Sequence, residues 1–127
     1  MWDGHFYLTQ VDLMQSRPQE ALAEAEKERR PAFRLAWLAL ANYALGRRGE
    51  SDDSLAQLAT KYQKETPFQI AEVYSFRGET ERAFEWLERA YALRDDSLAE
   101  IKGDPLLKGL RGDRRFTNLL RKMGLPL

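Results

Sequence analysis

Small and apolar side chains recur at helical spacing between residues 69 and 95. Ala71 and Ala83 lie twelve residues apart on either side of Gly78, and small side chains at such positions let two helix backbones approach closely. The apolar residues that complete this contact are Ile70, Tyr74, Leu87 and Ala90. The pattern predicts two antiparallel helices, joined by a turn at Gly78 and packed as a hairpin.

The same pattern occurs twice more toward the N-terminus. A shift of 32 residues brings the pair Ala39 and Ser51 onto the first pair, and a further shift of 30 residues does the same for Thr9 and Ala21. One helical hairpin cannot bury its own apolar face, so three hairpins in series favour a stacked repeat. No segment alternates with a period of two, and we expect no β-strand. The prediction is an all-α fold of about three helical hairpins.

Capping and helix-breaking residues set the expected boundaries. Residues 16–19 and 66–69 each combine a hydroxyl side chain, a proline and a glutamine, which predicts helices that begin near residues 17 and 67. Pro31 separates the first hairpin from the second, because proline inside a helix removes a hydrogen bond. The turn of the second hairpin, at residues 46–49, is expected to be looser than the turn at Gly78.

Beyond Asp96 the repeat pattern stops, and two segments follow that begin with Gly-Asp, at residues 103–104 and 112–113. Asp104 and Asp113 are good N-cap residues, and each precedes a short apolar segment. The apolar side chains of these segments are Leu106, Leu107, Leu110, Phe116, Leu119, Leu120 and Met123. A terminal repeat needs a cap, so we expect two helices that cover the third hairpin. The chain is predicted to be one domain, with hairpins at residues 1–31, 32–65 and 66–96 and a capping tail at residues 97–127.

The third hairpin resembles a tetratricopeptide (TPR) repeat. The residues on the positions of that family are Ile70, Ala71, Tyr74, Gly78, Ala83, Leu87 and Ala90. Residues 67–125 also look like the C-terminal end of the TPR arrays found in bacterial multidomain regulators. The resemblance implies a right-handed TPR-like α-solenoid with C-terminal capping helices, which acts as a scaffold for protein–protein interaction and has no enzymatic activity.

Function in this fold resides in the concave face, which the first helix of each hairpin lines. The candidate partner-binding residues are Phe6, Tyr7 and Gln10 from the first hairpin, Trp37, Leu40 and Tyr43 from the second, and Phe68, Gln69, Glu72 and Phe76 from the third. Ser75 lies on the same face. TPR proteins that bind acidic peptides carry cations here, and these positions hold no Lys, Arg or Asn. The face therefore favours a groove for an apolar or amphipathic peptide or helix.

Two other interpretations of this face remain open. In the first, the aromatic residues complete a small core or are covered by the tail helices. In the second, the face joins two copies of the chain, so that the chain is a self-association domain of a larger regulatory protein. The partner itself cannot be identified from the sequence.

The amino-acid composition limits the kinds of functional site that we expect in this chain. The 127 residues include no cysteine and a single histidine, His5, so we expect no metal site, no cofactor and no small-molecule substrate. Asp52 and Asp53 suit the N-terminal end of a helix better than acid–base catalysis. The triplet 111–113 reads Arg-Gly-Asp, for which we favour the N-cap role of its aspartate. The N-terminus has no signal-peptide pattern and no long apolar run, which favours a cytoplasmic protein without a membrane span.

Charge is uneven along the chain, although the net charge is zero. Residues 102–122 contain seven basic and two acidic residues, a net charge of +5, whereas residues 1–28 contain six acidic and two basic residues, a net charge of −4. Solvated helix faces account for this most simply, and head-to-tail association is an alternative. Phe116 is the only aromatic residue among these basic residues. Because single-stranded nucleic acids bind where several aromatic side chains stack with bases, we do not expect nucleic acid as a partner.

Overall fold

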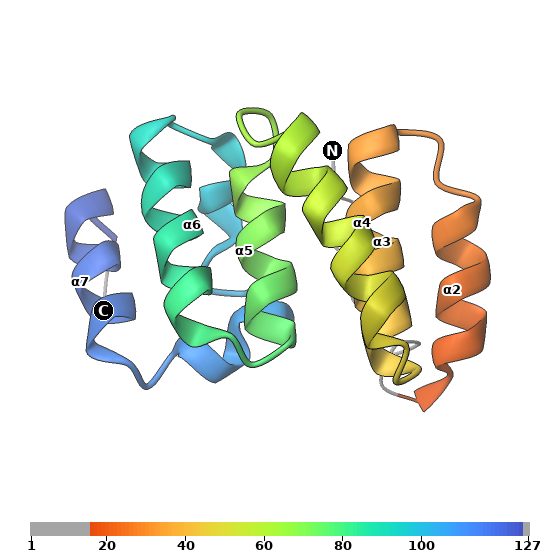
Figure 1. Cartoon of the computed structure of the whole chain (residues 1–127). Helices are drawn as coiled ribbons and strands as arrows, with labels where there is room; N and C mark the ends of the chain where they lie inside the picture. Colours follow the sequence, from red (N-terminus) through yellow and green to blue (C-terminus); the bar gives the residue numbers. More distant parts are fainter. Residues whose placement is uncertain (1–15, 126–127) are drawn as a thin grey trace. The chain divides into compact units, whose positions relative to one another are not determined.

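The structure is a computed structural model that describes residues 16–125, and these residues are helical without any strand (Figure 1). The elements are α2 (Pro18–Glu26), α3 (Pro31–Ala44), α4 (Arg48–Lys61), α5 (Pro67–Phe76), α6 (Thr80–Ala92), the 3₁₀ helices η1 (Asp96–Glu100) and η2 (Pro105–Leu110), and α7 (Arg114–Met123). The predicted all-α class is confirmed. Within the described residues, no helix is both long enough and apolar enough to cross a membrane.

The chain divides into two compact units, Met1–Tyr62 and Gln63–Leu127. We expected one domain from the sequence, with the boundary between the second and third hairpins at residues 65 and 66. The division between the units falls close to that boundary. The first helix of the first expected hairpin lies outside the described residues, and so do His5, Phe6, Tyr7 and Gln10.

In the first unit, α3 packs against both α2 and α4. Pro31 is the first residue of α3, where the absence of its N–H costs nothing, and α2 ends at Glu26 as the proline predicted. Ala39 and Ser51 are both fully buried, and Ser51 Oγ donates a hydrogen bond of 2.7 Å to the Ala39 carbonyl. The small pair therefore lies at the close approach of α3 and α4, as predicted.

In the second unit, α5 and α6 form the predicted hairpin, with Ala71 and Ala83 fully buried between them. Gly78 ends α5 in the left-handed region, at φ +77°, and the N–H of Glu79 donates to the carbonyl of Tyr74 at 2.9 Å. Glycine adopts this conformation without the steric cost that a Cβ brings. The turn is therefore specified at Gly78, where the sequence placed it.

The second hairpin has the same kind of turn, which corrects one expectation. Gly46 ends α3 at φ +79°, and the N–H of Arg47 donates to the carbonyl of Asn42 at 2.8 Å. The helix α4 begins at Arg48, so Gly49 is helical and the turn is not looser than the turn at Gly78. The expectation was wrong because Gly49, three residues after Gly46, resembles a turn residue although it lies inside α4.

Helices begin where the sequence predicted, at Pro18 and Pro67, and Thr66 is the N-cap residue of α5, but neither expected hydroxyl group caps a helix. The N-cap of α2 is Arg17, and the side chain of Thr66 makes no capping hydrogen bond to α5. The N–H of Phe68 instead donates to Asp95 Oδ2 at 3.3 Å. A carboxylate distant in sequence thus replaces the local hydroxyl at the positive end of α5.

The tail packs on the α5–α6 hairpin, with η2 against α5 and α7 against α6. Asp104 and Asp113 cap η2 and α7 through their carboxylates, as predicted, and Asp95 caps η1 in the same way. The segment after Asp104 is a 3₁₀ helix and not an α-helix. The buried apolar side chains of the tail are Leu98, Ile101, Leu106, Leu107, Leu110, Phe116, Leu119 and Leu120.

Candidate binding surfaces

The tail occupies the face of α5 that the sequence predicted to bind a partner. Phe68, Gln69 and Glu72 are all at most 2% exposed. Gln69 Nε2 donates to Ser97 Oγ at 3.2 Å, and Ser75 Oγ donates to the Leu106 carbonyl at 2.8 Å. Side chains at three-residue intervals lie on one face of a helix. This face of α5 therefore holds an irregular peptide segment, which belongs to the same chain.

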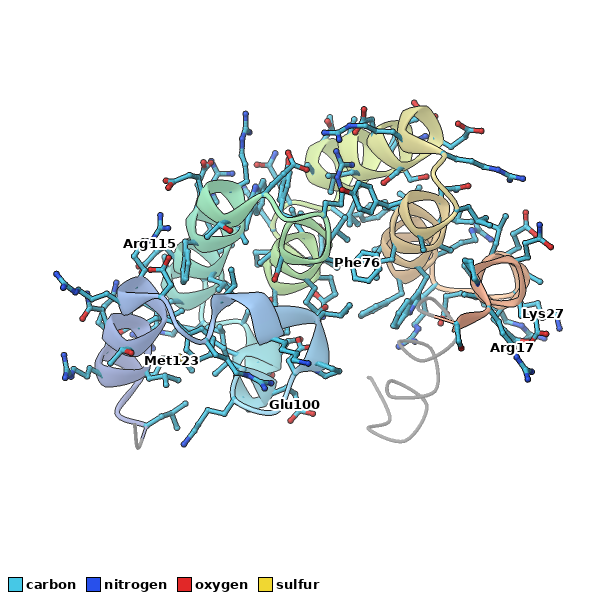
Figure 2. All side chains as sticks on the ribbon, turned by 90° about the horizontal axis from the view of Figure 1, so that it is seen from below. Arg17, Lys27, Phe76, Glu100, Arg115 and Met123 are labelled. Atoms are coloured by element: carbon cyan, nitrogen blue, oxygen red, sulfur yellow. The ribbon has the colours of Figure 1, made fainter. Side chains whose placement is uncertain are left out.

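Covering by the tail was one of the alternatives that the sequence left open, and it is observed for α5. Phe76, at the C-terminal end of α5, is half-buried (Figure 2). In the first unit Trp37 and Leu40 are each 2% exposed, and Tyr43 is half-buried. Most of the described candidate residues are thus interior side chains.

A buried pair of carboxyl groups joins α5 to the tail. Glu72 and Asp104 are 2% and 3% exposed, and Glu72 Oε2 is buried with no N–H or hydroxyl donor beside it among the described residues. The two carboxyl groups are near enough for each to shift the pKa of the other. Burial raises the pKa of Glu72 well above its usual value, and the nearby charges of Asp104 and Asp95 raise it further. Burial also raises the pKa of Asp104, although Glu72, the hydrogen bond from the N–H of Leu106 and the charge of Arg111 oppose that rise. No pattern in the sequence indicates this pair, because the two residues are 32 positions apart in the chain.

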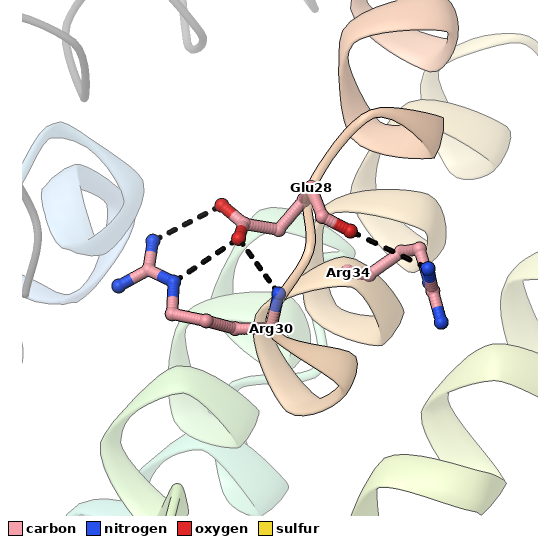
Figure 3. A network of polar contacts seen from close by, with 3 residues as sticks. All are labelled: Glu28, Arg30 and Arg34. Carbon is pink, nitrogen blue, oxygen red and sulfur yellow. Dashed lines mark hydrogen bonds and ion pairs between the residues drawn. The ribbon is translucent and has the colours of Figure 1, made fainter.

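A charged cluster in the first unit closes the connection between α2 and α3 (Figure 3). Arg30 grips the Glu28 carboxylate through Nε and Nη2, both at 3.0 Å, and lies over the Phe33 ring at 4.2 Å. Arg34 Nη1 donates to the Glu28 carbonyl at 3.4 Å. The hydrogen bond from Arg30 lowers the pKa of Glu28. These groups satisfy one another, so the cluster holds the connection in place.

The solvent-facing side of α7 forms an open polar depression, lined by Gly112, Asp113, Arg114, Thr117, Asn118 and Arg121. Arg114 and Arg121 are seven residues apart, about two helical turns, and so share one face. Both are exposed, and within residues 16–125 neither forms an ion pair or a side-chain hydrogen bond. Thr117 and Asn118 lie between them and supply neutral hydrogen-bonding groups.

The neighbouring basic residues of α7 are used to hold the helix in place. Arg115 Nη1 lies 3.0 Å from Glu81 Oε1 of α6, and Lys122 pairs with Glu88 of the same helix. Arg115 also clasps Asp113, the N-cap of α7, with Nη2 at 2.9 Å from Oδ2. This hydrogen bond lowers the pKa of Asp113 to about 2. The aspartate of the Arg-Gly-Asp triplet is therefore an N-cap, as predicted (Figure 2 labels Arg115).

The sequence showed that the tail is basic but not which of its cations are unpaired. Charge counting treats Arg114 and Arg115 alike, whereas the structure pairs only Arg115. The spacing of seven between Arg114 and Arg121 was the available signal, because it puts the two on one helix face.

The acidic pair Asp52 and Asp53 does not belong to a larger cluster of acidic side chains within residues 16–125. Asp52 and Asp53 are exposed near the beginning of α4, and Asp53 accepts a hydrogen bond from Gln57 at 3.4 Å. Among residues 16–125, no three His, Cys, Asp or Glu side chains come together as metal ligands. Comparison of the chain with family models, with curated proteins and with solved structures gives no match.

Proposed function

We propose that the protein is a non-catalytic protein-interaction module, and that an acidic segment of a partner protein binds along the solvent-facing side of α7. The observation that carries this proposal is the pair of unpaired arginines, Arg114 and Arg121, on one face of a helix whose other cations are paired. The TPR-like character of the hairpins is part of the proposal. Two hairpins that share a buried pair of small residues at the same spacing and a left-handed glycine at the turn support it.

The geometry of α7 suits carboxylates. A guanidinium presents a planar fork that matches a carboxylate in two parallel hydrogen bonds. Seven residues of helix place Arg114 and Arg121 about 10 Å apart along the axis, and carboxylates three residues apart on an extended peptide are separated by about the same distance. In a polyproline II segment, which has three residues per turn, acidic side chains three residues apart also lie on one face and so reach both arginines.

Nucleic acid fits this face less well. Single strands bind where aromatic rings stack with bases along a positive groove, and no aromatic residue lines this depression, while the Asp113 carboxylate lies at its edge. Phe116, the aromatic residue nearest in sequence, is buried at 4% exposure.

Self-association is the second candidate, because α2 carries acidic and no basic residues. Glu20, Glu24 and Glu26 lie within the nine residues of α2, and Glu20 and Glu26 are exposed. A second copy of the chain thus offers an acidic helix to α7.

Fluorescence anisotropy with a labelled peptide of Glu-Ser-Gly repeats tests the proposal at low salt. We expect binding that weakens severalfold in the double variant Arg114→Ala/Arg121→Ala, because exposed charge pairs each contribute about 0.2–1 kcal/mol. The matched control is Arg48→Ala/Arg82→Ala, which removes two exposed arginines elsewhere and should leave the affinity unchanged.

Three results count against this assignment. Equal affinity of the double variant and the control excludes the α7 face. Tighter binding of an oligonucleotide of the same charge indicates nucleic acid, and concentration-dependent dimers in light scattering that the double variant loses indicate self-association.

A further inference from the structure

We propose that the buried Glu72–Asp104 pair is a proton-dependent latch that holds the tail on the face of α5, so that loss of one proton releases residues 95–110 from the hairpin. The tail crosses α5 at several points, but this is the point at which two acidic groups meet. Ionisation of both would leave two negative charges in contact, away from water.

The hydrogen-bond pattern shows which group keeps the proton. Asp104 Oδ1 accepts from the N–H of Leu106 at 2.9 Å, so the Asp104 carboxylate already acts as the N-cap of η2. A hydrogen bond between two carboxyl groups needs one O–H donor, because an ionised carboxylate only accepts. Glu72 is the protonated partner, and it donates to the Asp104 carboxylate.

The charges around the pair reinforce this assignment. Arg111 donates from Nη2 to the Asp104 carbonyl at 2.9 Å, and its positive charge favours the ionised form of Asp104. On the other side Asp95, which caps α5 and η1, is a third acid close enough to oppose ionisation of Glu72. The charged side chains of α6 are exposed to solvent and do not neutralise the pair.

The direction of the pH effect follows from the raised pKa of Glu72. In the open state Glu72 meets water and ionises near its ordinary pKa of about 4.3. Below that pH both states hold the proton and the latch is fully formed. As the pH rises toward the raised pKa of the closed state, the open state releases a proton that the closed state keeps, so the closed state loses stability.

Native-state hydrogen exchange measures the opening of the tail. The reporters are the Ser97 and Leu106 amides, which donate to tail carboxylates, and the amides of α6 report on the whole hairpin. After correction for intrinsic exchange, we expect the opening constant of the tail amides to rise up to about tenfold per pH unit above about pH 4.3, as for release of one proton. The α6 amides should change less.

The decisive variant is Glu72→Gln, whose amide donates to Asp104 without a titratable proton. It should flatten the pH slope of the tail amides and leave only the part that the raised pKa of Asp104 contributes. The matched control, Glu100→Gln, removes an exposed carboxylate from the same tail (Figure 2) and should keep the slope of the wild type.

Equal pH slopes in Glu72→Gln and the wild type would overturn the proposal, and so would slopes in the wild type as steep in α6 as in the tail. If Glu72→Gln does not fold, the carboxyl carbon of Glu72 is titrated by NMR in the wild type. A titration midpoint above the ordinary value of about 4.3 supports the latch, and a midpoint at or below that value overturns it.

Discussion

Adjacent arginines at the beginning of α7 illustrate how contacts at the scale of a residue decide a role. Arg115 pairs with Asp113 and Glu81 and lies 4.6 Å over the Phe84 ring. Arg114, one position earlier, projects into the open depression. The same side-chain chemistry therefore serves the fold at Arg115 and remains available to a partner at Arg114.

Arg115→Ala should accordingly lower the stability of the second unit more than Arg114→Ala does. It removes an ion pair and a cation–π contact that join α7 to α6, and also the ion pair with Asp113, the N-cap of α7. An exposed substitution such as Arg114→Ala is expected to stay within about 0.5 kcal/mol of the wild type. Urea unfolding monitored by circular dichroism measures both variants. Equal stabilities would show that α7 is held by its apolar side chains alone.

Arg94 has the only left-handed backbone of a non-glycine residue among those described, at φ +55°. It follows α6 and leads into Asp95, whose N–H donates to the Ala90 carbonyl at 2.9 Å. A Cβ is disfavoured in this conformation, and glycine is the usual residue there.

Arg94→Gly should therefore raise the free energy of unfolding by about 0.5–1 kcal/mol, the conformational gain less the larger entropy of glycine in the unfolded chain. The opposite sign is expected for Arg82→Gly, because position 82 lies inside α6, where glycine is unfavourable. A destabilised Arg94→Gly variant would show that the arginine side chain contributes more than its backbone costs.

At the scale of the helix hairpin, the close approach of α5 and α6 depends on the small pair Ala71 and Ala83, both fully buried. Ala83→Leu should overpack this contact and cost about 1–3 kcal/mol in thermal or denaturant unfolding. The control is Ala92→Leu, the same substitution at an exposed position of the same helix, which should change stability little. Equal behaviour of the two variants would contradict the hairpin register.

Hairpins were predictable from the sequence because their determinants are local. The spacing of twelve in Ala71/Ala83 and the glycine at the turn fix which helix faces meet, and both are visible in the chain. The caps at Asp104 and Asp113 were predictable for the same reason, since an N-cap acts on residues two or three positions away.

The binding surface was less predictable because it depends on contacts distant in sequence. Gln69 and Ser75 were assigned to an open face, and only the folded tail shows that Ser97 and the Leu106 carbonyl occupy it. Glu72 likewise appeared to be a surface acid. Its burial beside Asp104 arises from a connection of 32 residues that no periodicity encodes.

At the scale of the whole molecule, the distributions of burial and of charge both favour α7 over the aromatic residues as the binding surface. Trp37, Leu40 and Phe68, which the sequence predicts as partner-binding residues, are interior residues. Trp37→Ala is therefore a core truncation of a kind that costs about 3–5 kcal/mol of stability. The net charge of zero hides a tail whose exposed cations include two without a partner on α7.

We propose that an acidic partner binds α7 and not an aromatic groove. The most direct measurement is the ¹H–¹⁵N NMR spectrum of the full chain titrated with the Glu-Ser-Gly peptide, with the uncharged Gln-Ser-Gly peptide as control. We predict shifts confined to the residues of the α7 depression, among them Arg114, Thr117 and Arg121, which disappear as salt is added and are absent with the control peptide. Shifts centred on Trp37 and Tyr43, produced equally by both peptides and insensitive to salt, would contradict the account.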